Sequence, residues 1–183
     1  MSAQLYTRNG DDGFTGLLGE GRVAKYAPQP EAYGTVDEAS AAMGIARAAA
    51  ASQRSRDVLL TAQRDLYKMM AELAATQQVA SQFRSIDAAR VAWLESETDA
   101  VTALIELPRA FVASGDSLSG AYLDLARTIV RRAERIVVRL VHDGLAENVE
   151  LVRYLNRLSS LLFVLGLYES ALAGVKTITL AKT

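Results

Sequence analysis

The sequence contains no cysteine among its 183 residues. This absence excludes disulfides, thiolate metal sites and cysteine nucleophiles together. Histidine is nearly absent as well, because His142 is the only one. It precedes an Asp-Gly pair at the expected end of a helix, where a cationic side chain interacts favourably with the helix dipole. We therefore interpret His142 as a helix-terminal residue and not as a metal ligand or a general base.

Long hydrophobic runs are also missing from the chain. The longest one, around residues 161–165, is far too short to cross a bilayer. Polar residues appear from the second position onward, without the apolar core of a signal peptide. These observations predict a cytoplasmic protein that has no membrane partner.

An excess of positive charge is the third absence. Lys and Arg total 20 and Asp and Glu total 21, which gives a net charge of −1. That balance excludes the strongly basic surface typical of nucleic-acid-binding proteins, so any cationic site must be local. Sixteen of the 20 basic residues are arginines, whose planar side chains suit bidentate contacts with carboxylates or phosphates.

Glycine is concentrated near the N-terminus. Five of the 12 glycines fall within residues 10–21, and residues 1–29 show no helical pattern. A glycine-rich loop can bring backbone N–H groups close to phosphates, although this one lacks the Gly-Lys-Ser/Thr ending of a P-loop. Composition alone is equally compatible with a flexible terminus.

Apolar residues recur at helical spacing through the rest of the chain. The pattern predicts five helices, which run from Pro30 past Ala46, over residues 54–79 and 86–105, from a cap at Asp116 or Ser117 to about His142, and from near Asn148 to Gly174. With half of all positions hydrophobic, we expect one all-α domain over residues 1–183. It consists of a five-helix bundle at 30–175 after the loop at 1–29. The strand signal is weak, and the tail after Gly174 is expected to be frayed.

One predicted helix carries a row of arginines. Arg127, Arg131 and Arg135 repeat every four residues beside an apolar face that includes Ala133 and Val137. Like charges at this spacing weaken an isolated helix, so we expect an anion such as a carboxylate or a polyphosphate against the row. A solvated charged face is the other interpretation.

Two pairs of polar residues lie on or beside helix faces that otherwise suit packing. Asp37 and Glu38 stand one turn inside the first helix, where they either meet an arginine partner or are ordinary surface acids. Asn156 and Ser160 lie one turn apart beside a seam of leucines. This second pair needs hydrogen-bond partners once the helix packs.

The most specific signal is a set of three separated motifs. They are Tyr6–Leu17 followed by Lys25, Glu31–Glu38, and Leu125–Arg135 paired with Tyr154–Ser159. These motifs resemble those of the ATP:cob(I)alamin adenosyltransferases of the propanediol-utilisation type. Their order and spacing agree with that family along nearly the whole chain, so the resemblance favours a functional role for the arginine row.

The resemblance implies a homotrimer of five-helix bundles whose active sites lie between subunits. ATP and Mg²⁺ would be held by the N-terminal loop of one subunit and the arginine helix of its neighbour, with cobalamin over a hydrophobic floor. The implied ATP-binding positions are Thr7, Arg8, Asn9, Gly10, Thr15, Gly16, Lys25, Glu134, Arg135 and Asn156. The implied catalytic positions are Arg131 and an intersubunit ion pair of Asp37 with Arg127, and Phe111 and Phe163 would line the corrinoid pocket.

The implied reaction transfers the 5′-deoxyadenosyl group of ATP to Co(I) and expels triphosphate. Arg131, Arg135 and Lys25 suit the stabilisation of that charged leaving group, and no general base is needed. Beneath the corrin ring, an aromatic such as Phe111 offers no donor atom and would favour the four-coordinate state that eases cobalt reduction. A cobalamin reductase and an adenosylcobalamin-dependent enzyme are the further partners that this chemistry implies.

The chain departs from the family pattern in four places. Val112–Asp116 replaces the usual Leu-Pro-Gly-Gly after the phenylalanine, Ser160 replaces an aspartate, and Asn9 replaces a threonine. The C-terminal segment is also short and dissimilar. Because a serine cannot fix a guanidinium group as a carboxylate does, Ser160 bears most directly on activity.

Three functional hypotheses follow from these patterns. The leading one is an active adenosyltransferase, and the second is a catalytically weakened ATP- and corrinoid-binding or carrier protein of the same fold. The third is a structural helical bundle in which the loop and the arginine row have no shared role.

Overall fold

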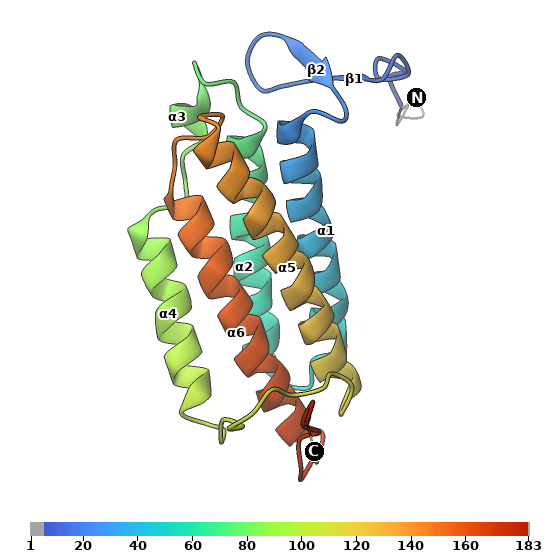
Figure 1. Cartoon of the computed structure of the whole chain (residues 1–183), viewed down its shortest axis with the longest axis vertical. Helices are drawn as coiled ribbons and strands as arrows, with labels where there is room; N and C mark the ends of the chain where they lie inside the picture. Colours follow the sequence, from blue (N-terminus) through green and yellow to red (C-terminus); the bar gives the residue numbers. More distant parts are fainter. Residues whose placement is uncertain (1–5, 183) are drawn as a thin grey trace.

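The computed structural model describes residues 6–182, in which five long helices pack side by side as an elongated bundle (Figure 1). The first five residues of the predicted loop lie outside this range. The elements are β1 (Phe14–Gly16), β2 (Arg22–Ala24), α1 (Pro28–Ala49), α2 (Gln53–Leu73), α3 (Ala80–Phe83), α4 (Ala88–Thr102), α5 (Leu118–His142) and α6 (Glu150–Leu172). None of the helices among the described residues has the length and apolar character to span a membrane. The predicted all-α architecture is confirmed.

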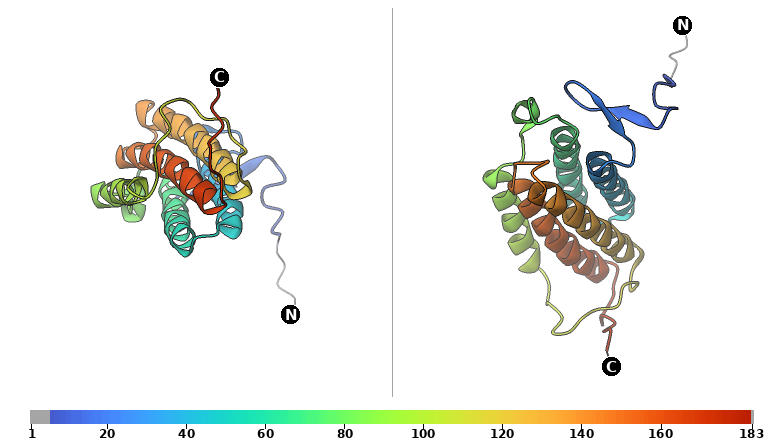
Figure 2. Two further views of the ribbon diagram at one scale, coloured as in Figure 1. Left: turned by 90° about the horizontal axis from the view of Figure 1, so that it is seen from below. Right: turned by 45° about the horizontal axis from the view of Figure 1, so that its top comes forward.

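The core lies where α5 packs between α1 and α6. Figure 2 shows this layering end-on, with α2 beside α1 and α4 on the outer side of α6. The leucine seam predicted for the last helix is fully buried, and so is a stripe of α5 that comprises Leu123, Ala126, Val130, Ala133 and Val137. The burial of these stripes follows from their helical spacing, because residues three and four apart share one face.

Helices α5 and α6 approach each other closely at a pair of glycines. A Cβ atom at Gly120 would lie 2.4 Å from Ser170 Oγ and 3.1 Å from the carbonyl oxygen of Gly166. Only glycine leaves room for this contact. The glycine pair therefore fixes the distance between the two helices near the start of α5.

Buried polar groups connect the outer helices to the core. The Asp65 carboxylate of α2 accepts hydrogen bonds from Arg90 Nε on α4 at 2.9 Å and from the Tyr154 hydroxyl on α6 at 2.8 Å. Burial and the neighbouring Asp65 raise the pKa of Tyr154 well above its usual value, so it stays a neutral donor. Glu169, which is fully buried, accepts the backbone N–H groups of Ala51 at 2.7 Å and Ser52 at 3.1 Å between α1 and α2.

Helix boundaries differ from the sequence prediction mainly at α2 and α4. Helix α2 ends at Leu73, six residues early, because the next residues bond to the N-terminal loop. The Leu18 N–H donates to the carbonyl oxygen of Ala74, and the carbonyl oxygen of Leu18 accepts from the Thr76 N–H, each at 2.8 Å. Helix α4 begins at Ala88 and ends at Thr102. Leu104, which the predicted helix over residues 86–105 includes, therefore lies beyond the helix with a relative exposure of 55%, so this end of the prediction was wrong.

The N-terminal loop contains a small β-hairpin that the weak strand signal did not reveal. Strands β1 and β2 pair antiparallel with Phe14 opposite Ala24. Gly19 in the connecting turn has φ 110°, and a Cβ atom there would lie 2.5 Å from Thr76 Oγ1. Three-residue strands are too short to produce an alternating pattern, so glycine content was the only sequence signal.

The tail after Gly174 is held in place, and the prediction of a frayed end was wrong. Val112 and Leu180 form an isolated antiparallel bridge. The helical pattern ends near Gly174, whereas the tail is fixed by backbone hydrogen bonds to residues 111–113, and such long-range bonds leave no local pattern in the sequence.

Candidate functional site

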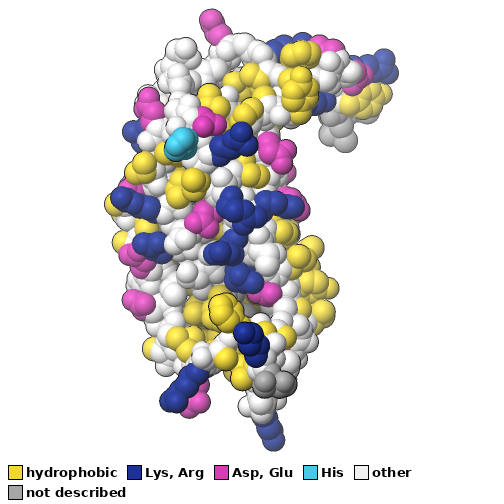
Figure 3. Space-filling view, viewed as in Figure 1, with side chains coloured by type: hydrophobic (Ala, Val, Ile, Leu, Met, Phe, Trp, Pro, Cys, Tyr) yellow, Lys and Arg dark blue, Asp and Glu magenta, His cyan; other side chains and the backbone are white. Residues whose placement is uncertain are grey.

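A hollow of about 800 Å³ lies over α6, between α4 and the first half of α5. Arg127 and Arg131 line one side, and Phe163 and Ser160 contribute from α6. Phe111 closes the end formed by the link between α4 and α5. In Figure 3 the basic side chains gather across the middle of this face, and hydrophobic side chains lie below them. The hollow is thus cationic on one side and apolar on the other.

The arginine row faces outward because its helix buries the opposite stripe. Arg127 Nε donates to Asp124 on the previous turn at 2.6 Å. Arg135 donates to the carbonyl oxygen of Arg131 at 2.9 Å, and both of these side chains are exposed. Arg132, outside the row, pairs with Glu38 of α1. The guanidinium group of Arg131 has no ion pair to a carboxylate within the described residues, which leaves its charge available to a ligand.

A hydrogen-bonded chain of side chains crosses α4, α6 and α5. Arg157 donates to Glu95 at 2.8 Å and to the Asn156 amide oxygen at 2.7 Å. Asn156 in turn donates to Glu134 at 2.8 Å. This chain provides the partners that the polar stripe of α6 requires, and it fixes the orientation of two residues to which the resemblance assigns nucleotide contacts.

Arg22 organises the N-terminal loop. Its guanidinium group makes a bidentate contact with Asp12, at 2.8 and 2.9 Å, and donates to the carbonyl oxygens of Asn9 at 2.5 Å and Phe14 at 3.2 Å. The hydrogen bonds from Arg22 lower the pKa of Asp12, so the pair is ionised at neutral pH. The Arg22 side chain therefore holds residues 9–14 together, a segment that includes the predicted nucleotide-binding residues Asn9 and Gly10.

The predicted nucleotide-binding residues of the loop lie in the β1–β2 hairpin or directly beside it in the sequence. A Cβ atom at Gly10 would stand 2.9 Å from Lys25 Nζ, so the ammonium group lies directly against the Gly10 backbone. Arg8 adopts φ 62°, which is uncommon for a residue with a side chain. Thr7 Oγ1 accepts the N–H of Asn9 at 3.4 Å, and Thr15 and Gly16 lie in β1.

The loop and the arginine row do not meet within one chain. The hairpin projects from the end of the bundle where α1 begins, whereas the row lies halfway along α5 (Figure 2). Among the described residues, no hydrogen bond or ion pair connects residues 6–25 to α5. Asp37 is exposed on α1 and forms no ion pair within this part of the chain. Its predicted pairing with Arg127 of another subunit stays a prediction.

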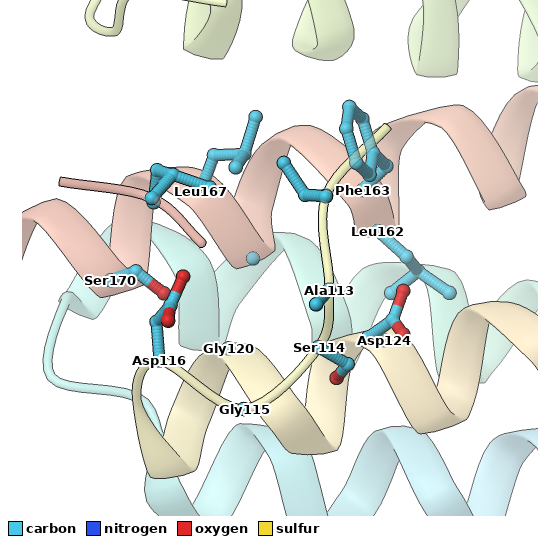
Figure 4. Close-up of a pocket in the computed structure, with 13 residues that line it drawn as sticks. Ala113, Ser114, Gly115, Asp116, Gly120, Asp124, Leu162, Phe163, Leu167 and Ser170 are labelled. Atoms are coloured by element: carbon cyan, nitrogen blue, oxygen red, sulfur yellow. The ribbon is translucent and has the colours of Figure 1, made fainter. Parts of the chain in front are cut away.

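A second, smaller cavity of about 50 Å³ lies behind the link that carries Phe111. Figure 4 shows residues 113–115 passing over it, with Asp116 and Ser170 at one end and Phe163 and Asp124 at the other. Phe163 and Asp124 line both cavities, so the small cavity adjoins the hollow at these two side chains.

Three residues of the site were not singled out from the sequence. Arg22 was a basic residue among loop glycines, Asp124 lies three residues before Arg127, and Arg157 stands inside a recognised motif without an assigned role. The spacing of Asp124 and Arg127 is a detectable signal for a helical ion pair. Nothing local in the sequence connects Arg22 to Asn9 or Arg157 to Glu95.

No group of three or more acidic, histidine or cysteine side chains that could hold a metal ion occurs among residues 6–182. A Mg²⁺ ion bound with a nucleotide takes most of its ligands from phosphate oxygens and water.

The sequence model of the cobalamin adenosyltransferase family matches residues 5–169. The chain belongs to the cobalamin adenosyltransferase family. The corrinoid adenosyltransferase PduO of Salmonella typhimurium is 38% identical over 168 residues, which cover 91% of this chain and 50% of the relative. The corrinoid adenosyltransferase of Bacillus subtilis is 37% identical over 177 residues, covering 94% of this chain and 89% of that one.

Solved structures of the cobalamin adenosyltransferase family share the fold. A variant PduO-type ATP:corrinoid adenosyltransferase from Lactobacillus reuteri, complexed with cobalamin and ATP, aligns with a TM-score of 0.90 and 28% identity, covering 98% of this chain and 100% of that one. The chain spans about half the length of the PduO relatives from Salmonella typhimurium and Citrobacter freundii. It corresponds to one segment of those longer proteins.

Replacing Arg22 by lysine should loosen residues 9–14, because lysine cannot make the bidentate contact with Asp12. Backbone ¹⁵N relaxation at Gly10 and Gly13 should report the added motion, whereas thermal unfolding of the bundle should not change. Since the pKa of Asp12 is lowered in the folded protein, wild-type loop order should be lost only as the pH falls below the ordinary aspartate range. Arg153→Lys in α6 is the matched control. Unchanged relaxation in Arg22→Lys would show that this contact does not order the loop.

Proposed function

We propose that this chain is an ATP:corrinoid adenosyltransferase, which transfers the 5′-deoxyadenosyl group of ATP to the cobalt of cob(I)alamin. Beside family membership, the observation that carries the proposal is the two-sided hollow. Arginines lie on one side, where a triphosphate needs positive charge, and Phe111 and Phe163 lie on the other, where a flat corrin ring needs apolar surface. A hollow of about 800 Å³ is in the range of ligand sites.

The reaction is a displacement at the C5′ carbon of ATP. Cobalt(I) donates an electron pair to C5′, a Co–C bond forms, and the C5′–O bond breaks so that its electron pair leaves with triphosphate. Cobalt is thereby oxidised formally to Co(III). The protein must align the two reactants and stabilise the growing charge on the leaving oxygen, and no side chain has to accept a proton.

Arg131 is the residue best placed for charge stabilisation. Its guanidinium group lines the hollow and has no carboxylate partner within the described residues. Arg127, by contrast, is held against Asp124 at 2.6 Å, which limits the directions in which it can donate. We assign Arg131 to the triphosphate and Arg127 to the positioning of the site, where Asp37 of a neighbouring subunit is its second carboxylate partner.

The glycine-rich hairpin supplies the other half of the nucleotide site from a second subunit. Within one chain Lys25 lies against Gly10 in the N-terminal loop, and among the described residues no hydrogen bond or ion pair connects this loop to α5, so we infer that a site using both forms between chains. We therefore propose a homotrimer with three intersubunit sites. In a closed ring, each loop contacts the arginine row of the next subunit through the same type of interface, so no loop and no row is left without a partner.

We assign the remaining predicted positions to contacts that bind and orient the nucleotide. They are Thr7, Arg8, Asn9, Thr15, Gly16, Glu134, Arg135 and Asn156. When Mg²⁺ accompanies ATP, it supplies charge neutralisation of the phosphates. The side chains of this protein bind and align the nucleotide around it. A cytoplasmic setting suits the reaction, because ATP and a cobalamin reductase are needed there, and an adenosylcobalamin-dependent enzyme would receive the product.

Arg131→Ala should reduce turnover by about 10²–10³-fold, because a charge that acts on the developing oxyanion is lost. The assay supplies ATP, Mg²⁺ and chemically reduced cobalamin and measures adenosylcobalamin and triphosphate. Arg139→Ala, on the same helix and outside the hollow, is the control and should keep wild-type turnover. Circular dichroism should show both variants folded. Wild-type protein that binds both substrates and forms no product would reject the proposed activity, and full turnover by Arg131→Ala would reject the role of this residue.

Ser160→Asp separates an active enzyme from a weakened carrier protein. Ser160 lies in the hollow with Arg131, and Asp124 already provides a carboxylate to the arginine face. We therefore expect turnover to change by less than about three-fold when the missing carboxylate is restored. Ser160→Asn, which adds similar volume without charge, is the matched control. A gain of about ten-fold or more in Ser160→Asp alone would instead identify the natural chain as a weakened enzyme.

A further inference from the structure

The tail after α6 pairs with the link that carries Phe111. Ala181 N–H donates to the carbonyl oxygen of Phe111 at 2.7 Å, and Ala113 N–H donates to the carbonyl oxygen of Thr179 at 2.8 Å. Val112 and Leu180 lie between these bonds as an antiparallel bridge. In Figure 1 the tail accordingly runs beside the link at the lower end of the bundle.

A side-chain contact fastens this pairing. Both oxygens of the Asp116 carboxylate accept hydrogen bonds from Thr179, one from the backbone N–H at 2.9 Å and one from the hydroxyl at 2.7 Å. Asp116 is free to do so because Ser117 caps α5, accepting the N–H of Gly120 at 3.1 Å. The bonds from Thr179 lower the pKa of Asp116, so its carboxylate is ionised at neutral pH. We call this contact the Asp116–Thr179 clasp.

The position of Phe111 depends on its backbone. Its side chain is 88% exposed, so burial in the core does not hold the ring. The link around it belongs to no helix and has no other backbone partner within the described residues than the tail. The pairing with the tail therefore fixes the backbone of the link, and with it the point from which the Phe111 side chain reaches the hollow that Phe163 also lines.

We propose that Asp116 and Thr179 are positioning residues for the corrinoid: by clasping the tail to the link they hold Phe111 at the apolar end of the hollow. The inference rests on the proposed function. Neither residue touches the reacting atoms, and both act through Phe111. Asp116 belongs to the stretch Val112–Asp116, in which this chain departs from the family pattern, and Thr179 belongs to its dissimilar C-terminal tail. The two departures from the family pattern are therefore joined by one contact.

The clasp predicts an effect on corrinoid handling that a loss of general stability would not produce. A Phe111 ring that moves cannot keep donor atoms away from the lower face of the cobalt. Bound cob(II)alamin should therefore shift from the four-coordinate state toward the five-coordinate state, which its absorption spectrum distinguishes. ATP binding, which depends on the loop and the arginines, should not change.

The test compares Asp116→Ala and Thr179→Val with the wild-type protein in the presence of ATP. We expect both variants to raise the KM for cobalamin by about three- to ten-fold and to lower the four-coordinate fraction, with the KM for ATP unchanged. Thr179→Ser keeps the hydroxyl group and should restore wild-type values. Asp99→Asn on α4 and Thr177→Val in the same tail are matched controls, because both side chains are exposed and form no hydrogen bond in the described structure.

The outcomes separate this inference from the proposed function. An active wild-type enzyme whose clasp variants keep the normal spectrum and KM would overturn the clasp and leave the function standing. A wild-type protein that forms no product, but whose bound cob(II)alamin changes coordination in the two variants, would support the clasp and reject the activity. Equal changes in the KM values for ATP and cobalamin, unrelieved by Thr179→Ser, would overturn the positioning role in favour of a structural one.

Discussion

The packing of α5 between α1 and α6 is the constraint on which the rest of the structure depends. One face of α5 is fully buried along the stripe that includes Leu123, Val130 and Val137. Because a helix turns by about 100° per residue, burying that face directs positions 127 and 131 to the outside. The hydrophobic core thereby decides where the guanidinium groups lie, and the close approach of Gly120 and Gly166 fixes the distance between α5 and α6 near the start of α5.

The two halves of the proposed site are stabilised in different ways. The arginine side rests on a rigid helix and a side-chain network that reaches Glu95 through Asn156 and Arg157. On the loop side, residues 9–14 have no hydrophobic core of their own and are connected by hydrogen bonds from Arg22 to Asp12 and to the carbonyl oxygen of Asn9. The β1–β2 pairing and the bonds of Leu18 to Ala74 and Thr76 fasten the rest of the loop to the bundle, so the contacts of Arg22 matter most for residues 9–14. The family relationship and the separation of the halves within one chain together support a site shared by two subunits.

The sequence allowed the five long helices and their buried faces to be predicted, because a 3.6-residue period records which side of a helix is covered. The family resemblance assigned site roles to Arg127, Arg131, Phe111 and Phe163, and the structure has all four lining one hollow, while their roles stay predictions. The hairpin could not be predicted, because two strands of three residues leave no periodic pattern. The clasp was missed for a similar reason: Asp116 was considered only as one of two candidate helix caps, and its partner lies 63 residues away in a tail without a helical pattern. Local rules fail where a long-range hydrogen bond decides the conformation.

A shared site requires that the loop of one subunit and the arginine row of another come together at each interface, which is the central claim made for this protein. Co-expression of Lys25→Ala and Arg131→Ala chains with different tags, followed by purification through both tags, tests this claim most directly. Each variant alone should be inactive. In a mixed closed trimer, one of the three interfaces pairs an intact loop with an intact row, so activity should return to roughly a third of the wild-type value. Doubly tagged oligomers without activity, or an absence of such oligomers, would contradict the claim.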